Sequence, residues 1–133
     1  MFKPYELENQ LSRLRGNIKL VGERWIVTPF QSPYGNLLTF EISYYDASRR
    51  VIVVKDFESA RQFSRWPKDN KDNPNFKLLE SLSEKYGLRI DLDGGSLVLT
   101  TSLDVLADRL TDLIKVSIVM LETIYLRNRG VIK

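Results

Sequence analysis

The C-terminal part of the chain carries the pattern that most constrains the fold. From Leu103 to about Arg127, apolar residues recur every three or four positions, which is the period of an α-helix. A helix with so long an apolar stripe needs an extended surface to cover it, and a β-sheet supplies one. We therefore predict a long C-terminal helix packed on a sheet. The stripe consists of Leu103, Leu106, Leu110, Leu113, Ile114, Leu121 and Ile124.

The rest of the chain divides into short segments that fit such a sheet. Stretches rich in β-forming residues lie between Ile18 and Val54 and again between Leu88 and Thr100, where Asp93-Gly94-Gly95 indicates a hairpin turn. One helical pattern covers Pro4 to Arg15. A second would be capped by Asp56 and run to about Trp66, and a third would be capped by Asn75 and be closed by Gly87 after Tyr86. Pro29 to Asn36 holds two prolines and a glycine, which predicts a loop. The predicted order is α-βββ-αα-ββ-α. Because hairpins dominate over βαβ units, we predict an α+β fold with a mostly antiparallel sheet and its helices packed on one face.

The composition limits the chemistry that this chain can perform. Its 133 residues suit a single domain over residues 1–133. Hydrophobic residues make up 43% of the chain and charged residues 28%, and this composition is typical of a globular protein. It contains no cysteine and no histidine, which excludes disulfides and thiolate catalysis and removes the commonest general base and metal ligand. We therefore predict a protein that is not an enzyme and needs no cofactor. The net charge of +3 allows an acidic partner without demanding nucleic acid.

The sequence shows no pattern of a secretion signal or a membrane span. The first residues, Met1 to Glu6, lack the apolar core of a signal peptide. The most apolar stretch, Leu113 to Leu126, is interrupted by Lys115 and Glu122 and is short for a bilayer. We expect a cytoplasmic protein that makes no membrane contact.

The predicted C-terminal helix carries a second set of apolar residues outside its main stripe. This set begins halfway along the helix and consists of Val116, Val119, Met120 and Leu126. A helix that is apolar on two sides must be covered on two sides, or it exposes an adhesive patch. One interpretation is that the N-terminal helix packs over this second face. The other is that the face forms a homodimer interface or binds a host protein.

A basic and aromatic group of residues offers an alternative function. Arg61 and Arg65 would share a helix face with Trp66 beside them, and Lys68 and Lys71 follow in the next loop. Surfaces that bind nucleic-acid backbones combine cations with aromatic rings in this way. The competing interpretation is an ordinary solvated helix and loop, diluted by neighbouring aspartates.

Three aspartates recur every four residues near the start of the C-terminal helix. Asp104, Asp108 and Asp112 would therefore lie along one helical face, as a metal or acid site could require. We favour the simpler interpretation, in which they are solvated and interact with the positive end of the helix dipole. The sequence thus predicts no metal site.

Several short motifs resemble one known family. Trp25-Ile26-Val27-Thr28-Pro29-Phe30, Val54-Lys55-Asp56, Tyr86-Gly87-Leu88 and the long final helix resemble the small bacterial and phage proteins called domain of unknown function 1828. The resemblance extends from about Leu7 to Tyr125. It implies no activity and no site residues, but it implies a phage or mobile-element context.

These observations predict a non-enzymatic protein–protein interaction module. It would bind itself or a host protein through the final helix. The alternative is a nucleic-acid-binding accessory protein that uses the basic and aromatic group.

Overall fold

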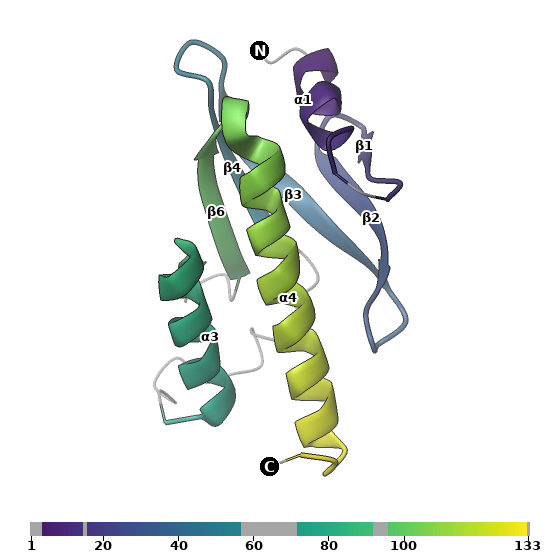
Figure 1. The fold of residues 1–133 in the computed structure, drawn as a ribbon, viewed down its shortest axis with the longest axis vertical. Helices are drawn as coiled ribbons and strands as arrows, with labels where there is room; N and C mark the ends of the chain where they lie inside the picture. Colours follow the sequence, from purple (N-terminus) through teal and green to yellow (C-terminus); the bar gives the residue numbers. More distant parts are fainter. Residues whose placement is uncertain (1–3, 15, 57–71, 92–95, 133) are drawn as a thin grey trace.

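The computed structural model describes residues 4–14, 16–56, 72–91 and 96–132, and they form a six-stranded sheet with helices on one side (Figure 1). This confirms the predicted α+β class, in the order α-ββββ-α-ββ-α over the described residues. Four strands follow the first helix where the predicted order has three, and the first two pair across the break at Gly22 and Glu23. The elements are α1 (Pro4–Leu11), β1 (Lys19–Val21), β2 (Trp25–Gln31), β3 (Leu37–Asp46), β4 (Val51–Asp56), α3 (Pro74–Tyr86), β5 (Arg89–Asp91), β6 (Ser96–Ser102), a 3₁₀ turn (Leu103–Val105) and α4 (Leu106–Asn128).

The strands are arranged in the order β1-β2-β3-β4-β6-β5, and every neighbouring pair is antiparallel. The predicted hairpin of β5 and β6 is present, with Ile90 opposite Leu97. Among the described strands, β4 and β6 are the one neighbouring pair that is not consecutive in the sequence, and Val54 lies opposite Leu99 in it. Both edge strands, β1 and β5, have three residues, and short edges offer little backbone for unwanted pairing.

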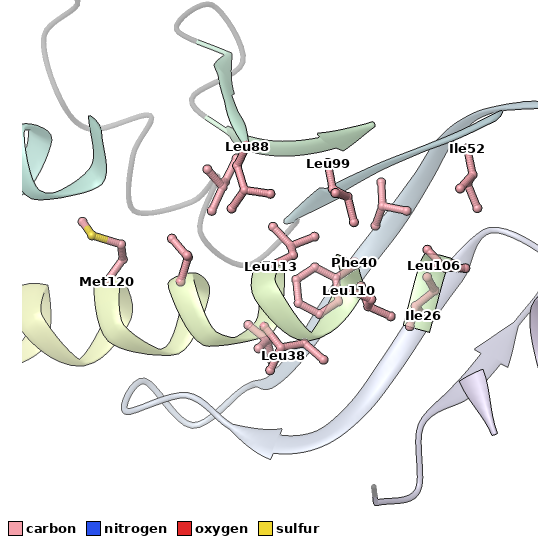
Figure 2. Packing of buried hydrophobic residues seen from close by; sticks show 14 of the residues in the cluster. Ile26, Leu38, Phe40, Ile52, Leu88, Leu99, Leu106, Leu110, Leu113 and Met120 are labelled. Atoms are coloured by element: carbon pink, nitrogen blue, oxygen red, sulfur yellow. The ribbon is translucent and has the colours of Figure 1, made fainter. Parts of the chain in front are cut away.

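The core lies between one face of the sheet and α4. Alternate residues of the strands, among them Ile26, Phe40 and Leu99, are fully buried on this face. Figure 2 shows the side chains of Leu110 and Leu113 on α4 meeting them. The predicted apolar stripe of the long helix is therefore the main contact between helix and sheet, and its burial, which removes these side chains from water, stabilises the fold.

Strand β2 continues through a proline that the sequence pattern assigns to a loop. Pro29 lacks a backbone donor, and the β2–β3 register shifts between Val27 and Gln31. The hydroxyl of Thr28 donates to the carbonyl of Leu38 at 2.7 Å and accepts from the amide of Phe30 at 3.3 Å. This buried side chain takes the place of the regular ladder bonds where the strand is distorted.

Helix α3 begins earlier than the sequence pattern suggests. Its N-cap is Asn73, whose side chain accepts from the amide of Asn75, and Pro74 occupies the first turn, where its missing donor costs nothing. The predicted end is confirmed, because Gly87 adopts a left-handed φ of 66°. The helix that the sequence predicts from Asp56 to Trp66 lies outside the described residues, except for Asp56, which ends β4. Among the described residues, no helix is both long enough and apolar enough to cross a membrane.

Candidate functional site

Two of the four predicted interface residues lie in the core. Val116 is 1% exposed and Met120 is fully buried, so neither is available to a partner. Val116 follows Leu113 by one turn and Met120 precedes Ile124 by one turn, so both extend the main stripe instead of opposing it. Figure 2 shows Met120 on the same side of α4 as Leu113. The predicted second face is therefore much narrower than its four residues suggest.

Helix α3 covers this flank of α4, whereas the N-terminal helix packs near the start of α4. Buried Phe76 and Leu79 point from α3 into the core. At the end of α3, the guanidinium of Arg109 donates to the carbonyls of Tyr86 at 2.8 Å and Gly87 at 3.1 Å. Cations stabilise a helix C-terminus in this way. Val116 and Met120 are thus covered by a second helix of the same chain, as one interpretation of the sequence proposed, but this helix is α3 and not the N-terminal helix.

The remaining two predicted residues lie on the exposed side of α4. Val119 is 44% exposed, and Leu126, two turns later, is half-buried. Figure 1 shows α4 in front of the sheet, and no described helix or strand crosses its near side. We call this surface the outer face of α4. It consists of Asp108, Lys115, Val119, Glu122, Leu126 and Arg129.

Charged side chains surround Val119 on the outer face. Asp108, Lys115 and Glu122 are exposed and form no ion pair or side-chain hydrogen bond within the part of the chain that the structure describes. The guanidinium of Arg129 lies 4.9 Å from the centroid of the Tyr125 ring. The outer face therefore carries charges of both signs whose hydrogen-bonding groups are free for another molecule.

A groove of about 350 Å³ lies between α1, β2 and the first turns of α4. Phe30, 38% exposed, and Val105, 46% exposed, form part of its apolar wall. Arg13, Asp108 and Thr111 contribute polar groups. The volume is in the range of small-molecule sites, but the polar groups do not form an acid–base pair that the structure holds together.

One side chain of this groove joins the two terminal helices. Gln10 of α1 accepts from the amide of Ala107 at 3.2 Å and donates to the carbonyl of Asp104 at 3.3 Å. Val105 precedes α4 and makes no capping side-chain bond of its own. Gln10, although distant in the sequence, therefore accepts a hydrogen bond from a backbone amide that has no acceptor within the first turn of α4.

Beside the groove, Arg50 holds together an ionic cluster. Its guanidinium donates to Asp104 at 2.8 Å and to Glu6 at 3.1 Å, and the hydroxyl of Tyr45 donates to Glu6 at 3.3 Å. The hydrogen bonds that Asp104 accepts from Arg50 lower the pKa of Asp104. The hydrogen bonds that Arg50 donates to Asp104 and Glu6 raise the pKa of Arg50. Burial, followed by the nearby charge of Glu6, raises the pKa of Tyr45. These shifts arise from structural pairing of α1 with the start of the C-terminal helical segment.

The three aspartates of the C-terminal segment do not converge on one site. Asp104 pairs with Arg50, Asp112 pairs with Arg109 at 2.7 Å, and Asp108 is exposed. Over the described ranges, no group of three acidic or other metal-ligating side chains could hold an ion. Asp108 fits the predicted solvated face, whereas Asp104 and Asp112 lie in ion pairs that the sequence pattern did not predict.

Sequence patterns missed the residues that fasten the terminal segments together. Arg50 and Gln10 belong to no periodic pattern, and their partners lie far away in the sequence. A partial signal for Arg50 exists, because it ends a tight turn with a left-handed φ of 54°. The predicted nucleic-acid group, Arg61, Arg65, Trp66, Lys68 and Lys71, lies entirely outside the described residues.

The chain was compared with protein-family models, with curated proteins and with solved structures, and none of the three comparisons found a match.

Proposed function

We propose that this domain is a non-enzymatic protein–protein interaction module that binds itself or another protein through the outer face of α4. The observation that carries the proposal is the exposure of Val119. This apolar side chain is 44% exposed in the middle of a helix whose opposite side is buried in the core. Because the rest of α4 packs against the sheet and α3, the outer face presents an ordered surface on which a partner can dock.

The residues around Val119 support this proposal. Leu126 continues the apolar line two turns later, and Lys115 and Glu122 flank it with charges. Protein interfaces commonly combine an apolar centre with a polar rim that excludes water. The partners of Asp104 and Asp112 also support a non-catalytic role, because these carboxylates are engaged by arginines that fasten the fold.

The resemblance to domain of unknown function 1828 motivates the biological part of the proposal. It favours a phage or mobile-element protein that acts on a host protein in the cytoplasm. The alternative function, a nucleic-acid-binding accessory protein, rests on the sequence pattern of Arg61, Arg65, Trp66, Lys68 and Lys71 alone.

Affinity capture from a bacterial lysate tests the proposal. The immobilised chain is compared with Val119→Glu and with the control Val21→Glu, which changes a valine of similar exposure on β1. We expect a protein that is retained by the wild type and by Val21→Glu and is lost with Val119→Glu. Equal capture by all three proteins would exclude the outer face of α4 as the site that binds another protein. Material that disappears after nuclease treatment would favour the nucleic-acid alternative.

A further inference from the structure

We propose that the outer face of α4 docks on the same face of a second copy of this chain, with the two helices antiparallel. This inference rests on the proposed function and names its partner. The argument comes from the order of the charges on the outer face.

The charged residues of the outer face form one line along α4. Asp108, Lys115, Glu122 and Arg129 follow one another at every seventh position, and seven residues make about two helical turns. Their charges alternate in sign from the start of the helix to its end. All four side chains are exposed.

The alternation is self-complementary when two copies run in opposite directions. The midpoint between Asp108 and Arg129 falls between Ile118 and Val119, and the midpoint between Lys115 and Glu122 falls at the same place. A two-fold axis through this point therefore sets Asp108 of one copy at the height of the other copy's Arg129. It likewise sets Lys115 at the height of the other copy's Glu122. Every charge in the line meets its opposite, and each pair occurs twice by symmetry.

The opposite orientation is disfavoured by the same charges. In a parallel two-fold pair, each residue of the line meets its own copy, so that Asp108 faces Asp108 and Lys115 faces Lys115. Like charges that face each other across an interface oppose binding. The charge order therefore selects the antiparallel arrangement.

The apolar residues of the outer face occupy suitable positions in this arrangement. Val119 lies next to the two-fold axis, where the two helices approach each other at the centre of the contact. Leu126 lies two turns away on the same side of the helix, near the start of the partner helix. Contact with a second copy would remove both side chains from water, which favours association.

Charge reversal and complementation test this proposal. Lys115→Glu and Glu122→Lys are compared with the wild type and with Lys77→Glu, which makes the same charge change at an exposed position of α3. The mass of each protein in solution is measured over a range of concentrations by sedimentation equilibrium. We expect a concentration-dependent wild-type dimer, a similar dimer for Lys77→Glu, and dimers weakened roughly tenfold or more for each reversal at low ionic strength.

An equimolar mixture of the two reversed proteins provides the decisive result. In a mixed pair, the two acidic side chains at positions 115 and 122 of one chain face the two basic side chains at these positions of the other. We therefore expect the mixture to associate, although each variant alone associates weakly. The double variant Lys115→Glu/Glu122→Lys restores opposite charges at these positions and should also associate. Both effects should diminish in about 1 M salt, where charges are screened within a few ångströms.

A wild-type chain that remains monomeric at high concentration would overturn the second-copy inference. A dimer that tolerates both reversals would also overturn it. The proposed function fails separately, when Val119→Glu changes neither the capture of other proteins nor the self-association of the chain. A monomeric chain whose capture of another protein depends on Val119 would therefore preserve the function and reject self-association.

Discussion

Arg50 and Asp104 are joined by a guanidinium–carboxylate contact of 2.8 Å that links the β3–β4 hairpin to the start of the C-terminal helical segment. The backbone carbonyl of Arg50 also accepts from the amide of Leu103 at 2.8 Å. Glu6 of α1 contacts the same guanidinium, so three separate parts of the chain meet at one side chain. Together with Gln10, this side chain fastens the N-terminal helix beside the start of α4.

The contact predicts how stability depends on pH. The folded-state pKa of Asp104 is lower than its unfolded value, which is about 3.9. Its contribution to stability is therefore present above pH 4 and is lost as pH falls through the folded pKa. Asp104→Asn should be less stable than the wild type at pH 7 and should lose less stability on acidification. Urea titrations at several pH values measure this, and parallel losses in the two proteins would contradict it.

The hydrogen bond between Gln10 and the start of α4 predicts that two substitutions of Gln10 lower the unfolding free energy to different extents. Gln10→Ala leaves the amide of Ala107 without its acceptor and should cost about 1 kcal/mol of unfolding free energy. Gln10→Glu keeps an acceptor and adds a negative charge near the positive end of the helix, so it should cost less. Urea denaturation at neutral pH compares the two. A larger loss for Gln10→Glu would contradict this expectation, and would mean that repulsion between the new carboxylate and the carbonyl of Asp104 outweighs the retained acceptor.

Burial separates two adjacent residues of α4 that the sequence pattern places together. Met120 is fully buried, so Met120→Ala should lower the unfolding free energy by about 2–5 kcal/mol. Val119 is 44% exposed, so Val119→Ala should change it by about 0.5 kcal/mol or less. Thermal and urea unfolding of the two variants check this under conditions where the chain is monomeric. Similar losses would contradict the placement of the outer face.

Gly87, at the end of α3, is a position where one added methyl group should lower the unfolding free energy. Gly87 has a φ of 66°, and a Cβ there would lie 3.0 Å from the Nη2 atom of Arg109. Gly87→Ala should therefore cost about 1–2 kcal/mol from backbone strain and crowding. Gly22 has a similar φ of 61° with no neighbour within 4 Å of an added Cβ, so Gly22→Ala reports the backbone cost alone. Equal losses for the two variants would show that Arg109 moves away without penalty.

Local signals were enough to predict much of this fold. The apolar spacing of Leu106, Leu110 and Leu113 marks the long helix, because a helix brings such residues to one side. The motif Asp93-Gly94-Gly95 predicts that the strands on either side of it pair, as β5 and β6 do. Gly87 marks a helix end, because its left-handed backbone conformation suits glycine. Each of these signals involves residues close together in the sequence, where backbone geometry alone determines the outcome.

Only the tertiary structure decided which surfaces remain free. The sequence grouped Val116 and Met120 with Val119, and the position of α3 then buried the first two and left the third exposed. Likewise, Gln10 reaches Ala107, and Arg50 reaches Asp104, across long stretches of chain. The sequence by itself determined most of the elements and the main apolar stripe of α4, because these depend on local periodicity. The tertiary structure determined which side of α4 is covered by α3 and which side stays exposed. Packing brings together residues that lie far apart in the sequence, and no local pattern indicates such contacts.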